Sequence, residues 1–161
     1  SFARLGYNYR LSELNAALGL AQLKRLDEIV EKRAQVAQRY TELLLDNTDL
    51  VLPSVEPGVK MSWFVYVVRL NDQYTREERD RVIAGLHRHD VGAAAYFPPI
   101  HLQPQFRSHG YGPGDFPITE SISGRTIAIP FHTNLTDREQ RLVAQTLAQM
   151  IQREQLNPRT G

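Results

Sequence analysis

Asn8 and Arg10 are the first residues of the chain whose side chains could bind a ligand. They lie in an aromatic, irregular segment, residues 1–10, directly before a predicted helix for which Ser12 is the expected N-cap. Amide and guanidinium side chains beside the free backbone N–H groups of a helix start can hold an anion such as phosphate. An asparagine in a turn and a surface arginine explain the same residues, so the pattern alone leaves both interpretations open.

Tyr96 and His101 flank two consecutive prolines in the segment Tyr96-Phe-Pro-Pro-Ile-His-Leu-Gln-Pro104. The prolines stiffen the exit from a predicted strand and fix where the two side chains project, which lowers the entropy lost on binding. A rigid connector with an exposed histidine fits equally well. The segment opens a long loop, residues 98–114, and loops of that length in compact domains are usually functional or disordered.

The remaining histidines do not predict a metal site. His87 and His89 are two positions apart on a predicted helix, so their side chains point about 200° apart and cannot share one ion. His109 and His132 have no acidic residue or histidine at ligand spacing. The chain has no cysteine, which excludes disulfides, thiolate catalysis and cysteine-bound zinc.

Length and composition indicate one globular domain. The chain has 161 residues, 42% of them hydrophobic and 23% charged, with a formal net charge of +1. This balance gives no electrostatic reason to expect a nucleic-acid or membrane partner, and no apolar run approaches the roughly 20 residues that span a bilayer. We therefore expect a soluble, cytoplasmic protein. With neither an initiator methionine nor a signal-peptide pattern, the chain is expected to be the C-terminal part of a longer protein.

A long amphipathic helix is predicted from Ser12 to about Asn47. Its apolar residues recur at spacings of three and four and form one stripe: Ala16, Leu20, Leu23, Leu26, Val30, Ala37, Tyr40 and Leu44. Such a helix would be about 50 Å long, which exceeds the width of a domain of this size. Part of the stripe is therefore expected to pack on another domain or a second subunit.

The rest of the chain predicts an α/β (α+β) fold, a small sheet covered by helices. Strands are expected at residues 50–52, at 62–70 with burial on both faces, at 91–97 and at 126–130. Capping boxes at Thr75/Glu78 and Thr136/Glu139 begin two helices, the second with an inward face of Leu142, Val143, Leu147, Met150 and Ile151. A helical turn near residues 104–106, a short helix entered at Asp115 and Pro117, and frayed final residues complete the prediction.

Three segments together resemble the DegT/DnrJ/EryC1/StrS family of pyridoxal-phosphate-dependent sugar aminotransferases. They are Gly6–Leu23, Tyr96–Pro104 and Gly114–Pro130, and they occur in the family's order. The resemblance implies the small C-terminal domain of a fold-type-I enzyme. Residues 1–47 would then be an inter-domain loop and linking helix, 48–156 the small domain and 157–161 a frayed tail. The large cofactor-binding domain would lie outside this chain.

The resemblance also implies roles for the candidate residues. Asn8 would contact the cofactor phosphate of the neighbouring subunit in a homodimer, with Arg10 assisting it, while Tyr96 and His101 would contact the nucleotide-sugar substrate. Tyr7 and Tyr9 would pack against the partner subunit. The complete enzyme would transfer an amino group, from glutamate, to a nucleotide-linked keto sugar.

No lysine of this chain fits the Schiff-base residue that pyridoxal phosphate requires. Lys24 and Lys32 lie on a charged helical face, and Lys60 follows the Pro57-Gly58 turn. We therefore expect no catalytic residue in this segment, which alone would be inactive. Two alternatives stay open: a sugar dehydratase variant of the same family, and a non-catalytic α/β interaction or regulatory module that retains the fold.

Overall fold

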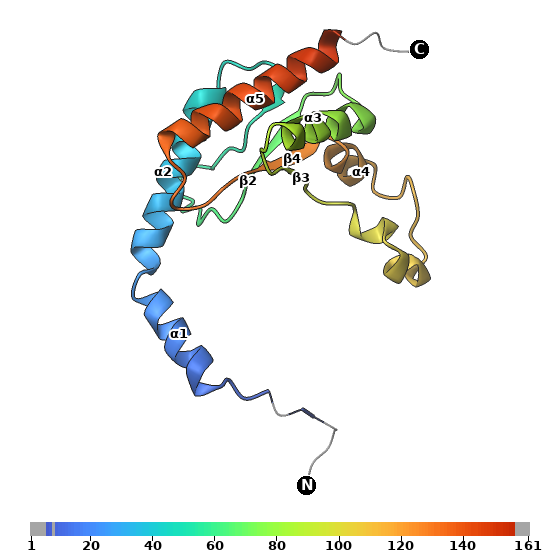
Figure 1. Cartoon of the computed structure of the whole chain (residues 1–161). Helices are drawn as coiled ribbons and strands as arrows, with labels where there is room; N and C mark the ends of the chain where they lie inside the picture. Colours follow the sequence, from blue (N-terminus) through green and yellow to red (C-terminus); the bar gives the residue numbers. More distant parts are fainter. Residues whose placement is uncertain (1–5, 8, 157–161) are drawn as a thin grey trace.

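A four-stranded antiparallel sheet is the centre of the fold (Figure 1). The computed structural model describes residues 6, 7 and 9–156, so the predicted frayed tail at 157–161 lies outside the described residues. The strand order is β1 (Leu50–Val51), β2 (Tyr66–Leu70), β4 (Thr126–Ile129) and β3 (Ala94–Ala95). Three helices pack over the sheet: α2 (Leu26–Leu44), α3 (Arg76–Arg88) and α5 (Asp137–Leu156), with α5 in contact with both others.

The core lies between one face of the sheet and these helices. Tyr66 of β2 is paired with Ile129 of β4, and Val68 with Ile127, so all four side chains share one face and all are buried. From the helices, the core receives residues with at most 7% exposure: Val36, Ala37, Tyr40 and Leu44 of α2, Val82 and Leu86 of α3, and Val143, Leu147, Met150 and Ile151 of α5. The mixed helix-and-sheet fold is the one that the sequence predicts.

Helices α3 and α5 approach each other closely at Gly85. A Cβ atom on this residue would lie 2.5 Å from Sδ of Met150, a distance that no packed pair of atoms tolerates. Gln140 of α5 donates a hydrogen bond from Nε2 to the carbonyl oxygen of Val36, at 2.9 Å, and so ties α5 to α2. The helical layer is therefore held by both close packing and buried hydrogen bonds.

The single helix predicted over residues 12–47 is wrong, because the structure has two helices there. Helix α1 (Glu13–Leu23) ends at Lys24, and α2 begins at Leu26. Between them the N–H of Arg25 bonds to the carbonyl of Gln22, and the backbone of Arg25 (φ −107°, ψ 6°) leaves the helical region. This tightened last turn interrupts the i→i−4 ladder without a glycine or proline.

Two predicted strands are shorter than expected, and one predicted inward residue points outward. Trp63 adopts a positive φ of 42°, so the strand predicted at 62–70 begins only at Tyr66, and its side chains alternate between buried and partly buried positions. The strand predicted at 91–97 is confined to Ala94–Ala95. Leu142 is 57% exposed, whereas the other four predicted inward residues of α5 are buried.

The predicted helix starts are confirmed. Thr75 and Glu78 form a capping box at α3, and the hydroxyl of Thr136 and the carboxylate of Glu139 cap the start of α5 in the same way. The short helix α4 (Pro117–Ser123) begins with Pro117, and the preceding loop contains the 3-10 turns η1 (Ile100–Leu102) and η2 (Pro104–His109). None of the helices within residues 6, 7 and 9–156 has both the length and the apolar character needed to cross a bilayer.

Candidate functional site

The N-terminal arm, residues 6, 7 and 9–23, carries Arg10 away from the domain (Figure 1). Arg10 is exposed and precedes α1, whose N-cap is Ser12: its hydroxyl accepts a hydrogen bond from the N–H of Asn15 at 3.3 Å. Tyr7 and Tyr9 are exposed, with ring centroids 5.5 Å apart. Asn8, the predicted phosphate contact, lies outside the described residues. Among the described residues, no contact joins Arg10 to Tyr96 or His101.

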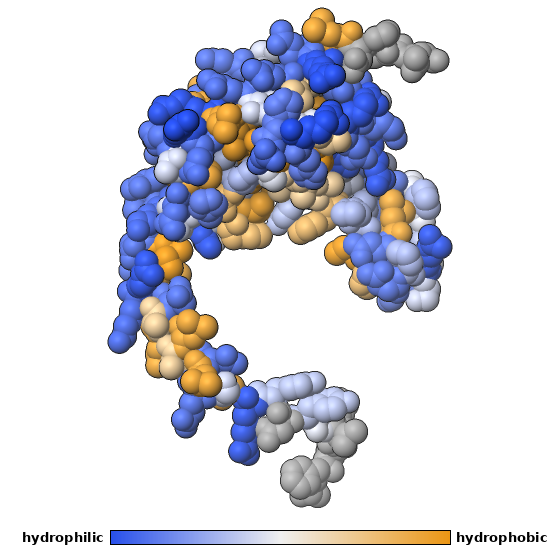
Figure 2. Space-filling model, viewed as in Figure 1, coloured by the Kyte–Doolittle hydropathy of each residue, from blue (hydrophilic) through white to orange (hydrophobic). Residues whose placement is uncertain are grey.

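Helix α1 exposes four leucines. Among the described residues it buries none of its own side chains, and Leu14, Leu18, Leu20 and Leu23 are each more than 60% exposed. Figure 2 shows these apolar side chains on the arm below the domain. The predicted stripe therefore divides in two: Ala37, Tyr40 and Leu44 of α2 pack in the core, whereas Leu20, Leu23 and Leu26 are at least half exposed in the single chain.

Replacing both Leu20 and Leu23 with glutamine is expected to weaken self-association of the full-length protein at least tenfold. Each leucine removed from an interface forfeits about 1.5–3 kcal/mol of apolar burial, so two together exceed one decade in the dissociation constant. Sedimentation velocity across a concentration series measures this change. The matched control replaces Leu45 and Leu142, which are exposed on the domain itself. Equal dimer dissociation constants for the two double variants would contradict the interface role of α1.

The second candidate region is the loop between β3 and α4, and a single carboxylate organises it. Oε1 of Glu120, on α4, lies 3.0 Å from Nε2 of His101, 2.9 Å from the N–H nitrogen of Gly114 and 3.3 Å from that of Phe116. Its Oε2 accepts from Gly114 as well, at 3.0 Å. The ring of His101 also packs on that of Phe116, with centroids 4.8 Å apart. Glu120 thereby joins both ends of the loop to α4.

The hydrogen bond from the backbone N–H of Gly114, and next that from His101, lower the pKa of the Glu120 carboxyl below its usual value. The carboxylate is therefore ionised at neutral pH and acts only as an acceptor. Because an acceptor needs a donor, Nε2 of His101 carries a hydrogen in this contact. The His101 side chain is only 9% exposed, so this hydrogen bond lies in a largely enclosed position.

His101 lines an aromatic hollow of about 390 Å³, the His101 pocket. Its other lining residues are Ile100, Phe106, His109, Tyr111, Phe116 and Thr119. Rings supply most of the wall, and polar groups are few. Such a composition suits a planar or partly apolar ligand that is oriented by a small number of hydrogen bonds.

Tyr96 does not line the His101 pocket. Its ring stacks on that of Phe97 at a centroid distance of 3.9 Å, and its carbonyl oxygen accepts a hydrogen bond from the hydroxyl of Thr126 at 2.6 Å. This bond ties the end of the β3 segment to β4. Tyr96 is half-buried beside the sheet, so the structure brings His101 and Glu120 together rather than His101 and Tyr96.

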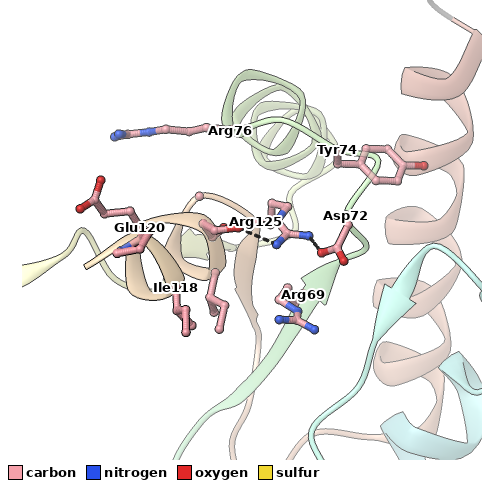
Figure 3. Close-up of a pocket in the computed structure, with 11 residues that line it drawn as sticks. Arg69, Asp72, Tyr74, Arg76, Ile118, Glu120 and Arg125 are labelled. Carbon is pink, nitrogen blue, oxygen red and sulfur yellow. Dashed lines mark hydrogen bonds and ion pairs between the residues drawn. The ribbon is translucent and has the colours of Figure 1, made fainter. Parts of the chain in front are cut away.

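A larger hollow of about 680 Å³ lies between β2, α3 and α4 and is lined by three arginines (Figure 3). The guanidinium group of Arg125 donates hydrogen bonds to the carboxylate of Asp72 and to the carbonyl and hydroxyl oxygens of Ser121. Figure 3 shows the guanidinium groups of Arg69, Arg76 and Arg125 pointing in different directions. An anion would need convergent donors, so this hollow is the weaker candidate despite its size.

The described residues do not make a complete pyridoxal-phosphate site. All three lysines are exposed, and Nζ of Lys32 lies 2.7 Å from Oε1 of Glu28. A lysine that holds the cofactor needs a sheltered position where it can lose its proton. Arg10 could supply one phosphate contact, and the described part of the chain offers no further part of the site.

His87 and His89 both contact backbone carbonyl oxygens close to them in the chain. Nε2 of His87 lies 2.6 Å from the carbonyl oxygen of Ala93, and Nδ1 of His89 lies 3.0 Å from that of Gly85, so each ring bonds locally to backbone. Within the described ranges, no group of three or more histidine, cysteine, aspartate or glutamate side chains could hold a metal ion.

Glu120 is the functional candidate that sequence reasoning missed. It lies inside the motif Gly114–Pro130, three residues after the helix-opening Pro117. An acidic residue in the first turn of a helix is usually explained by its interaction with the helix dipole. Glu120 therefore gave no reason to expect a contact with His101, earlier in the chain. The signal that could have found it was the position of a carboxylate beside a glycine-rich loop exit.

The sequence of the chain is similar to those of known proteins. The sequence model of the DegT/DnrJ/EryC1/StrS aminotransferase family matches residues 2–148. The dTDP-3-amino-3,4,6-trideoxy-alpha-D-glucose transaminase of Micromonospora megalomicea subsp. nigra is 33% identical over 151 residues, which cover 91% of this chain and 39% of that protein. Across five such relatives, the chain spans 34% to 39% of their length.

Solved structures share the fold. A DegT DnrJ EryC1 StrS aminotransferase from Brucella abortus superposes with a TM-score of 0.77 at 28% identity, covering 91% of this chain and 38% of that one. The PLP form of a candidate sugar aminotransferase, Spr1654 of Streptococcus pneumoniae, gives a TM-score of 0.83 at 21% identity, covering 89% and 36%, and a PMP form is also known. These likenesses confirm the predicted fold class, that of a small domain in fold-type-I aminotransferases.

Proposed function

The chain belongs to the DegT/DnrJ/EryC1/StrS aminotransferase family, and we propose that it is the C-terminal part of an enzyme that aminates a nucleotide-linked keto sugar. In the reaction, the amino group of glutamate replaces the ketone oxygen of the sugar, and glutamate leaves as 2-oxoglutarate. Pyridoxal phosphate, held by a domain outside this chain, would supply the electron sink for this exchange. The observation that carries the proposal is the family match together with 33% identity to a dTDP-amino-sugar transaminase.

Within that enzyme, this chain would bind and orient rather than catalyse. The His101 pocket takes part of the nucleotide sugar, with His101 as the polar contact and the surrounding rings as its apolar wall. Tyr96 stands at the neighbouring strand end and contacts the substrate from there. Asn8 and Arg10 contact the cofactor phosphate of the neighbouring subunit, a role supported by the exposure of Arg10 on an arm that projects from its own domain.

The enzyme would be a cytoplasmic homodimer, with residues 1–47 as the link between domains and 48–156 as the small domain, and the exposed leucines of α1 support the dimer. In this arrangement the exposed leucines of α1 lie against the large domain or the second subunit, which removes them from water. The arm also projects from its own domain, as a contact with a neighbouring active site requires. Dimerisation and cofactor binding would then depend on the same segment.

Amino transfer is tested with the full-length protein in the reverse direction. The protein, loaded with pyridoxal phosphate, is incubated with 2-oxoglutarate and a panel of dTDP- and UDP-linked amino sugars, including dTDP-3-amino-3,4,6-trideoxy-α-D-glucose, and glutamate is measured. Glutamate formation that requires one of these nucleotides supports the proposal. No glutamate from any member, together with loss of water from a keto-sugar nucleotide, would replace amino transfer by the dehydratase reaction.

The chain on its own is expected not to bind pyridoxal phosphate covalently, because Lys24, Lys32 and Lys60 are all exposed. The chain is incubated with the cofactor, reduced with borohydride and weighed by intact-mass spectrometry. Only a low, non-stoichiometric level of adduct, spread over the three lysines, is expected. One stoichiometric adduct at a single lysine would assign the cofactor-holding residue to this chain and overturn the division of roles.

A further inference from the structure

We propose that Glu120 is a positioning residue for the sugar-nucleotide half of the reaction, acting through His101. The inference rests on the proposed function and deepens it by naming the group that sets how His101 meets the substrate. It starts from one observation: a single carboxylate oxygen receives hydrogen bonds from the histidine ring and from the backbone at the other end of the same loop.

The contact fixes which nitrogen of His101 carries the hydrogen. An ionised carboxylate can only accept, so Nε2 is the protonated nitrogen, and in the neutral ring Nδ1 is then an acceptor. Among the described residues, Nδ1 of His101 has no recorded partner. A histidine held in this tautomer is suited to accept a hydrogen bond from a hydroxyl or N–H group, both of which a nucleotide sugar carries.

Glu120 also fixes where the ring lies. Its bonds to the N–H groups of Gly114 and Phe116 hold the loop end, and Phe116 packs against the His101 ring. The ring is therefore held at Nε2 by the carboxylate and also by contact with the ring of Phe116, which is tilted by 59° to it. Side chains that meet a ligand lose less entropy on binding when a second set of contacts holds them in place.

Substitutions can separate the charge of Glu120 from its shape. Three of its four contacts are made by Oε1, so Glu120→Gln can keep an oxygen at that position and lose only the charge and the secondary contact of Oε2 with Gly114. Glu120→Ala removes every contact. Glu77→Ala is the matched control, because Glu77 is an exposed glutamate in the first turn of α3.

The experiment measures the two half-reactions of the full-length enzyme separately, by the absorbance of the cofactor. One uses glutamate, and the other uses the best amino-sugar nucleotide of the panel above. For Glu120→Ala, kcat/KM is expected to fall about tenfold or more with the nucleotide, chiefly through KM, and to stay within about twofold with glutamate. Glu120→Gln should recover most of the loss, and Glu77→Ala should match the wild type.

A double variant tests whether Glu120 acts through the histidine. Glu120→Ala combined with His101→Ala should be no slower with the nucleotide than His101→Ala alone, because the carboxylate then has no ring to position. If the losses in kcat/KM of the two single variants multiply in the double variant, the inference is overturned. Equal losses in both half-reactions with a lowered Tm would also overturn it, since they indicate a purely structural role.

The outcomes separate this inference from the proposed function. If the wild-type enzyme performs neither half-reaction, the proposed function is wrong, and the positioning role of Glu120, which depends on it, is wrong as well. If the wild type performs both and Glu120→Ala is indistinguishable from Glu77→Ala, the aminotransferase assignment stands and only the role of Glu120 is wrong.

Discussion

Replacing Arg79 with methionine is expected to lower the free energy of unfolding by about 3–5 kcal/mol, the largest stability effect predicted for a single side chain of this fold. Arg79 lies in α3 with its side chain only 3% exposed. Its Nη1 donates to the carbonyl oxygens of Ser123 at 3.1 Å and Thr126 at 2.8 Å, and its Nε to the carboxylate of Asp80. Methionine fills a similar volume but leaves both carbonyl groups without this donor.

The expected size follows from the charge of the donor. A hydrogen bond to a charged group contributes about 1.5–3 kcal/mol, and a buried polar group left without a partner costs about 1–3 kcal/mol. The guanidinium also lies at the C-terminal end of α4, where a positive charge offsets the helix dipole. Loss of Arg79 is therefore expected to loosen the end of α4, the helix that carries Glu120.

Urea unfolding of the full-length protein, followed by far-UV circular dichroism, measures the change. Arg88→Met, at an exposed position in the last turn of α3, is the matched control for the loss of one arginine. Arg79→Lys keeps the charge without the forked donor and is expected to fall between the wild type and the methionine variant. Equal midpoints for Arg79→Met and Arg88→Met would show that the buried guanidinium is not a stabilising tie.

The elements that local chemistry determines could be predicted from the sequence. The capping boxes at Thr75 and Thr136 and the proline at the start of α4 each place a helix start correctly, because the residues that satisfy the free N–H groups lie within the same turn. The break at Arg25 has no such local cause. Leucine and charged residues around it all favour helix, so the pattern predicted one continuous element.

The strand ends were missed for a related reason. Trp63 and Phe64 read as strand residues, yet Trp63 takes a positive φ and stacks its ring on that of Tyr66, with centroids 5.7 Å apart. This conformation depends on packing around Tyr66, which also stacks on Phe131. Contacts between residues far apart in the chain decide where the strand begins, and propensity cannot represent them.

The candidate site was also predicted only in part from the sequence. His101 could be selected from the sequence because two prolines precede it, and it does line a pocket. Its partner Glu120 is 19 residues further along, and only the folded loop brings the two together. The roles of Asn8, Arg10 and Tyr96 stay predictions, since they depend on a substrate, a cofactor and a second subunit.

Replacing Asn8 with alanine in the full-length enzyme is expected to weaken retention of pyridoxal phosphate by roughly ten- to hundredfold while the fold stays intact. A neutral amide that donates to a phosphate makes a charge-assisted hydrogen bond worth about 1.5–3 kcal/mol, which corresponds to one to two decades in affinity. Cofactor absorbance after dialysis measures the loss, and the Tm of the cofactor-free protein tests the fold. Asn15→Ala, the same change on the exposed surface of α1, is the control and should retain the cofactor.

Hybrid dimers test whether Asn8 acts across the subunit boundary. The Asn8→Ala variant is mixed with a variant that lacks the cofactor-holding lysine of the large domain, and differently tagged subunits allow the mixed dimer to be purified. If Asn8 serves the neighbouring subunit, one site of the hybrid combines an intact lysine with an intact asparagine, so amino transfer should return to about half of the wild-type rate per dimer. If Asn8 serves its own subunit, the only site with a lysine also carries alanine at position 8, and the hybrid is no more active per dimer than the Asn8→Ala homodimer. Because the two arrangements predict opposite results in one purified species, recovery assigns the contact to the partner's active site and its absence removes that role from Asn8.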